Sequence, residues 1–137
     1  MAKEKEIKIN FEKIKGFDKK TGRFNFSANR ITQNSFEFYT LSIPAKVLAA
    51  TCFVTSRYEN PTIGFQRNLN KKKALEIAHY IDVEKGTIPA SIILSAQPEA
   101  NLELMKGKTL SFQNNEHAFL IIDGQHRVWG YKLAKGN

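Results

Sequence analysis

Hydrophobic and polar residues alternate along much of the first third of the chain. Residues 7–12 and residues 23–26 both follow a period of two, which is typical of strands with one buried face. Residues 18–22, which end in a glycine, have the length of a short hairpin loop between them. Residues 35–42 are rich in aromatic and β-favouring residues. The pattern therefore predicts three strands in this region.

Three segments have the spacing or the ends of helices. Residues 44–53 begin with a proline, which suits a first helical turn because it has no N–H to lose there. Residues 70–83 begin with Asn70 as N-cap, and residues 128–134 form a third apolar segment. In the second helix, helical spacing predicts one stripe facing the core, with His79 as a partly buried packing residue on it: Ala74, Leu75, Ile77, Ala78 and Ile81.

Two further apolar runs predict strands in the second half. Residues 91–95 are apolar enough for a strand covered on both faces. Residues 109–112 and 118–122 flank a polar stretch and are expected to form a hairpin. The loop 58–64 is expected to separate the β-rich beginning from the rest. Together the elements predict an α+β fold with a mixed, mainly antiparallel sheet and three main helices.

Composition agrees with one compact unit, since 137 residues with 42% apolar and 11% aromatic residues supply a real core. The net charge of +8 favours an anionic partner, with nucleic acid first. Residues 1–30 carry nine Lys/Arg against four Asp/Glu. Their lysines form either a solvated strand face or a ribbon that faces DNA.

The single cysteine excludes an intramolecular disulfide, and its apolar surroundings predict that Cys52 is a buried packing residue. The isolated histidines and the lack of a Cys-x-x-Cys pair give no sign of a zinc site. The N-terminus lacks the apolar stretch of a signal peptide, and no run is long enough to span a membrane. These features predict a cytoplasmic protein with no membrane partner.

Asp123-Gly124-Gln125-His126-Arg127 lies between a predicted strand and a predicted helix. A glycine turn at a helix N-terminus can hold phosphate, and an arginine fork suits bidentate binding of it. We interpret His126 as a hydrogen-bond donor to phosphate, although a general base is the alternative. Asp123 could cap the helix, bind a metal or orient His126.

A second segment, Gly64-Phe65-Gln66-Arg67, precedes the helix at residues 70–83. Arg67 could clamp an anion from the other side. Lys71, Lys72 and Lys73 lie in the first turn, where the helix dipole disfavours cations. They indicate either a bound anion or a solvated helix end.

These motifs, together with Gly86-Thr87-Ile88-Pro89, resemble the DGQHR-domain family, which includes DndB, associated with DNA phosphorothioation, and DpdB, associated with 7-deazaguanine modification of DNA. The order of elements is more distantly similar to the ParB/sulfiredoxin superfamily. The resemblance covers residues 36–137 and is weak over residues 1–35, which we interpret as a basic β-hairpin extension. Domains of this kind continue further past the motif at residues 123–127, so we expect a C-terminally truncated form.

The resemblance implies a phosphate-binding turn at Gly124, Gln125, His126 and Arg127, with Gln66 and Arg67 approaching the same pocket. Sulfiredoxin has its nucleophilic cysteine where this chain has Gln125, which excludes sulfinic-acid reduction. We include Lys71 and Lys72 in the predicted site.

Two functions follow. The first is a regulatory or DNA-recognising module of a DNA-modification or defence system, with DNA, a nucleotide or other modification proteins as partners. The second is an enzyme, an NTPase or ParB-like nuclease that uses a nucleoside triphosphate with Mg²⁺, in which Asp123 holds the metal and His126 activates water. Glu59, Glu76 and Asp82 are further candidate ligands. A purely structural capped turn is the third interpretation.

Overall fold

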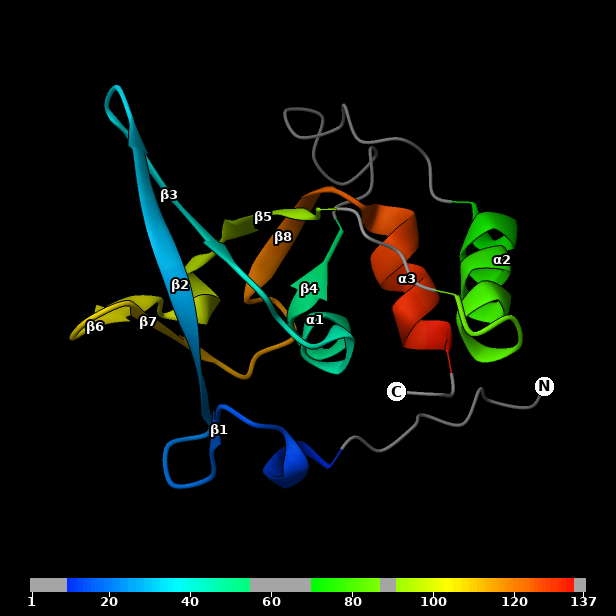
Figure 1. Ribbon diagram of the computed structural model, residues 1–137, viewed down its shortest axis with the longest axis horizontal. Coiled ribbons are helices and arrows are strands. Elements are labelled where there is room, and N and C mark those ends of the chain that lie inside the picture. Colours follow the sequence, from blue (N-terminus) through cyan, green and yellow to red (C-terminus); the bar gives the residue numbers. More distant parts are fainter. Residues whose placement is uncertain (1–9, 55–69, 87–90, 135–137) are drawn as a thin grey trace.

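The computed structural model describes residues 10–54, 70–86 and 91–134, and has the predicted α+β fold (Figure 1). In the described residues, strands pair antiparallel except β4 with β8. One sheet has the order β1-β2-β7-β6, with β3 also paired to β2, and the other has the order β4-β8-β5. The first comprises β1 (Phe17–Asp18), β2 (Arg23–Gln33), β3 (Phe36–Leu41), β6 (Glu103–Met105) and β7 (Thr109–Gln113).

The second sheet carries the predicted site at its end. It comprises β4 (Cys52–Phe53), β5 (Ile93–Ala96) and β8 (Phe119–Asp123). The helices described are α1 (Ala45–Thr51), α2 (Lys71–Asp82) and α3 (Gln125–Leu133), with short 3-10 turns η1 (Phe11–Lys13) and η2 (Pro98–Ala100). In Figure 1 α3 lies between α2 and the second sheet. No helix in these ranges is long and apolar enough to cross a membrane.

Aromatic side chains join the two sheets in one core. Phe24 and Phe112 are fully buried and face each other across β2 and β7. Phe112 meets Phe119 of β8 edge to face, with ring centroids 4.9 Å apart. Such edge-to-face contacts add to the free energy of burial. Val47, Cys52, Ile121 and Val128 extend this core toward the helices.

The predicted hairpin of residues 109–122 is wrong. β7 pairs with β2 and β6, whereas β8 pairs with β4 and β5 in the other sheet. Both edges of β7 and both edges of β8 are occupied, so neither strand has an edge left to pair with the other. The intervening turn, where the Ala118 N–H donates to the Asn115 carbonyl at 3.1 Å, therefore carries the chain from one sheet to the other.

A hairpin with its turn after Asp18 is present, but the strand predicted at residues 7–12 is wrong in its described part, since the first strand of the hairpin is β1 at Phe17–Asp18. β1 contributes only Phe17–Asp18, while residues 11–13 form η1 because the Asn10 side chain accepts from the Glu12 N–H at 3.2 Å. Residues 7–9 lie outside the described ranges. The division of the chain at residue 35 stays a prediction.

Two helix boundaries also differ from the sequence patterns. The helix expected at 128–134 begins earlier, since α3 spans Gln125–Leu133. The helix expected at 44–53 ends at Thr51, because Cys52 and Phe53 pair as β4 with Phe119 and Leu120. The strand expected to be covered on both faces is β5, and this expectation is wrong, because Ile93 is 54% exposed and Ala96 is also exposed. The strand at 36–41 and the burial of Cys52 are confirmed.

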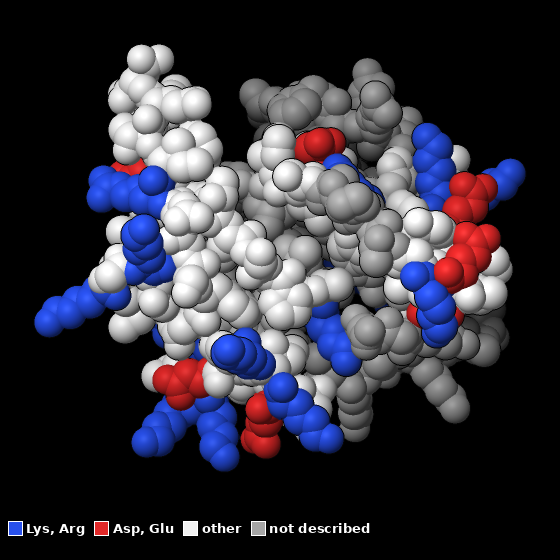
Figure 2. Space-filling view, in the orientation of Figure 1, with Lys and Arg blue, Asp and Glu red and all other residues white. Residues whose placement is uncertain are grey.

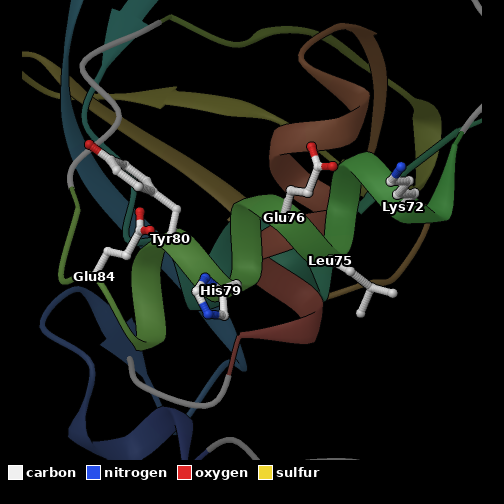
Figure 3. A pocket seen from close by; sticks show the side chains of 6 residues that line it. All are labelled: Lys72, Leu75, Glu76, His79, Tyr80 and Glu84. Atoms are coloured by element: carbon white, nitrogen blue, oxygen red, sulfur yellow. The ribbon is translucent and has the colours of Figure 1, made fainter.

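The buried stripe of α2 is narrower than predicted. Ala74 and Ala78 are buried, but Leu75 is 49% exposed and His79 is exposed. Both line a surface hollow with Lys72 and other outward residues of the helix (Figure 3). The interpretation of His79 as a packing residue is therefore wrong, because α2 packs through its small residues and turns the adjoining positions to solvent.

Candidate phosphate-binding site

Gly124 alone links β8 to α3 and sets the direction of the turn. It is buried and has a φ of 103°, in the left-handed region. A Cβ placed there would lie 3.0 Å from Ile92 Cγ1 and 3.2 Å from Arg127 Nη2. The position therefore needs glycine both for its backbone conformation and for space.

The start of α3 has no side-chain cap in the described part of the chain. Gly124 is its N-cap and accepts the helical bond from the Val128 N–H at 3.0 Å. The first N–H groups of a helix have no partner within the helix, and they carry the positive end of its dipole. The sequence motif thus forms a strand-to-helix turn that can accept an anion.

Arg127 returns over this turn toward Asp123. Their Nη2 and Oδ2 atoms are 3.6 Å apart, with the arginine side chain 20% exposed and the aspartate 66% exposed. Asp123 does not cap α3 in the described residues, because Gly124 is the N-cap and no side chain caps the helix. The carboxylate instead orients the guanidinium and partly neutralises it.

His126 connects the turn to the start of α2. Its Nε2 accepts a hydrogen bond from the Asn70 backbone N–H at 2.9 Å. An accepting Nε2 carries no proton, so this atom is not a donor to phosphate in this arrangement. The bond brings the α2 N-terminus beside the α3 N-terminus, across 56 positions of sequence.

Asn70 is the predicted N-cap of α2. Its side-chain oxygen accepts from the Lys72 N–H at 2.9 Å. Lys71, Lys72 and Lys73 follow in the first turn and are exposed. The Gln125 amide is turned back into the motif, donating to the Ile122 carbonyl at 3.1 Å.

Gly130 allows the two helices to approach closely, and the sequence analysis missed it. A Cβ at this position would lie 2.7 Å from Ile77 Cβ and 3.2 Å from the Ala74 carbonyl oxygen. The sequence signal that could have identified Gly130 is a glycine inside a helical pattern. Glycine weakens a helix, so its presence there indicates close packing against a neighbour. This packing aligns the two helix starts that carry the candidate site.

Several predicted site residues are not part of the contacts around the Gly124 turn. Gln66, Arg67 and Glu59 lie outside the described residues. Glu76 lies on the outward face of α2 with Lys72 (Figure 3). Within residues 10–54, 70–86 and 91–134, no three or more His, Cys, Asp or Glu side chains are grouped as a metal site requires.

Comparison with known proteins gives one family. Searches of curated proteins and of solved structures found no significant match. A family model for DndB, described as DNA-sulfur modification-associated, matches residues 26–134 and so includes the whole Gly124 turn and all three described helices. The chain therefore belongs to the DndB family of DNA-sulfur modification-associated proteins.

Proposed function

We propose that this protein binds the phosphate backbone of DNA at the turn between β8 and α3, as a recognition or regulatory component of a DNA-sulfur modification system. The observation that carries the proposal is the hydrogen bond from the Asn70 N–H to His126 Nε2. This bond brings the Gly124 turn beside the lysine-bearing first turn of α2, which supports a single shared binding site. The finer resemblance to DGQHR and ParB-like domains is part of the proposal.

Arg127 is the central binding residue of the proposed site. Its planar guanidinium can contact two phosphate oxygens at once, and the α3 N-terminus beside it favours the same charge. Lys71 and Lys72 add positive charge at the start of α2, where a bound phosphate would offset their unfavourable interaction with the helix dipole. Gln66 and Arg67, which lie outside the described residues, are included in the proposed site on the basis of the sequence motif.

The first test is a salt-dependent titration of duplex DNA with Arg127→Ala. Each lost phosphate contact should weaken binding for all sequences alike and lower the salt slope by about one. Arg127→Lys should recover part of the affinity, because it restores the charge without the fork. Lys85→Gln, at the opposite end of α2, is the matched control and should bind as the wild type. Unchanged affinity and slope in both Arg127→Ala and Arg67→Ala would refute the proposal.

A second test separates binding from catalysis at the same turn. If the site only binds phosphate, Asp123→Asn should bind DNA more tightly, since a carboxylate near the anion is removed. If the protein is an Mg²⁺-dependent NTPase or nuclease, the same substitution should abolish cleavage of labelled NTP or plasmid. Cleavage by the wild type that is lost in Asp123→Asn would contradict a binding-only role.

A further inference from the structure

The β2–β3 ribbon extends beyond the body of the protein. β2 pairs with β7 only from Arg23 to Ser27, and from Ala28 to Gln33 it pairs with β3. The last bond to the β6–β7 turn is from the Ala28 N–H to the Lys108 carbonyl, at 2.6 Å. Beyond this point β2 and β3 pair only with each other among the described strands, and their tip forms the upper left extremity of the molecule in Figure 1, while residues 37–41 line a hollow shared with β5.

The two faces of the ribbon differ in chemistry. On one face, Glu37 accepts from Arg30, with an Nε–Oε1 distance of 2.7 Å, and from the Tyr39 hydroxyl at 2.6 Å. This polar network stabilises the pairing of the strands. On the other face, Phe38 pairs with Ile31, and Phe36 pairs with Gln33 beside the turn.

The apolar end of the ribbon is unusually exposed. Phe36 is 75% exposed and Phe38 is 40% exposed. The turn itself holds Asn34 at a φ of 54°, which brings Phe36 to the first position of β3, directly after the tip. A phenyl ring in this position gains free energy when a partner removes it from water.

Positive charge lies at the base of the ribbon. Lys106 and Lys108 are exposed in the β6–β7 turn beside Ala28, while Lys19 and Lys20 are exposed in the β1–β2 turn at the opposite end of β2. Figure 2 shows Lys and Arg side chains along the left and lower left of the molecule, the side on which Figure 1 places these strands. Because Arg30 is matched by Glu37, the net charge comes from the lysines. The lysines beside the ribbon complement the phosphates of DNA. The exposed phenyl rings at its tip complement the stacked bases.

We propose that the β2–β3 ribbon enters a groove of double-stranded DNA and that Phe36 wedges against its base pairs. A two-stranded ribbon fits a DNA groove, and phenylalanine is one of the residues that open base steps and bend the duplex. The ribbon tip and the starts of α2 and α3 lie toward the same, upper side of the molecule (Figure 1). This inference rests on the proposed function, and it assigns a second contact on the same duplex.

The test measures bending and affinity together on the full chain. A duplex of about 30 base pairs, labelled at both ends for energy transfer, is titrated over a salt series. Phe36→Ser should lose the bending signal and weaken binding about tenfold, in the range of an aromatic–base stacking contact, without changing the salt slope. Phe36→Leu should retain most of both, because leucine is also a wedge residue.

Val83→Ser is the matched control, because Val83 is 65% exposed at the other end of α2. It should bind and bend DNA as the wild type does. If Phe36→Ser bends and binds DNA normally while Arg127→Ala is impaired, the ribbon proposal is overturned and the proposed function stands. If Arg127→Ala binds DNA normally while Phe36→Ser is impaired in bending and binding, the Arg127 site is rejected and the ribbon proposal stands.

The oligomeric state distinguishes a protein partner from DNA. Light scattering of wild type and Phe36→Ser should give the same mass. A wild-type dimer that becomes a monomer on Phe36→Ser, with unchanged DNA binding, would overturn the proposal and identify a second copy of this chain as the occupant of the ribbon.

Discussion

At Gly124 a backbone requirement and a steric requirement coincide. We expect Gly124→Ala to reduce the free energy of unfolding by about 1–3 kcal/mol, because a side chain there is strained at this φ and would press on Ile92 and Arg127. The measurement is urea unfolding together with DNA affinity, which should also fall.

Gly107→Ala provides the matched control for this prediction. Gly107 also has a positive φ, of 82°, but nothing lies within 4 Å of an added Cβ. Its substitution should cost only the backbone strain, about 1 kcal/mol. Equal losses of stability in the two variants would show that the contacts around Gly124 are unimportant.

Cys52 should behave as an unreactive thiol in the native protein. Burial raises its pKa from 9.0 to about 11, against smaller lowering effects from the Thr51 hydroxyl and Lys132. The thiolate absorbance should therefore appear near pH 11 in the native protein and near pH 9 after unfolding. Cys52→Ala supplies the baseline. Equal titration midpoints of the Cys52 thiol in the native and the unfolded protein would contradict this prediction.

The sign of the resulting pH dependence follows from the same shift. The unfolded thiol loses its proton first, so its contribution to stability is complete below about pH 9 and is lost as the pH rises toward 11. Lys132 acts in the opposite direction. Burial lowers the pKa of its ammonium group, which donates to the Cys52 carbonyl at 3.0 Å. The difference between wild type and Cys52→Ala reports the thiol together with its electrostatic effect on Lys132.

At the scale of elements, the α2–α3 contact depends on Gly130. Alanine inside a helix is normally more stable than glycine by about 1 kcal/mol. Here we expect Gly130→Ala to destabilise the protein by about 1–3 kcal/mol, because the new methyl group would overlap Ile77. Thermal or urea unfolding measures the change.

A double-mutant cycle tests the cause. Ile77→Ala should make Gly130→Ala less costly, since the overlapping side chain is removed. Additive effects of the two substitutions would show that Ile77 does not limit the approach of the helices. DNA affinity should follow the stability of the α2–α3 contact if the two helix starts act together.

The success of individual element predictions followed local chemistry. The Asn70 cap, the strand at 36–41 and the turn before β2 were predictable, because capping side chains, β-favouring residues and turn residues act within a few positions. The partners of the strands at 109–112 and 118–122 could not be predicted, because an apolar strand sequence does not specify which strand it pairs with. The exposure of Leu75 was missed for a related reason, since the width of a buried stripe depends on what packs against it.

At the scale of the whole molecule, two sheets share one aromatic core, and α3 connects that core to α2. The Gly124 turn is placed by β8, which lies between β4 and β5, while the start of α2 is placed through Gly130 and His126. The sequence predicted both motifs, and the family resemblance implied that they share one pocket. It did not predict the hydrogen bond that joins Asn70 to His126.

The sequence by itself determined the α+β class, the Asn70 cap of α2, the glycine turn with its arginine and the excess of positive charge. These features depend on short-range spacing and on composition, which are complete in the order of residues. The tertiary structure alone decided the sharing of strands between two sheets, the contact between the two helix starts and the projection of the β2–β3 ribbon. Those features are set by competition among distant segments for the same edges and faces, and that competition is resolved only when the chain packs.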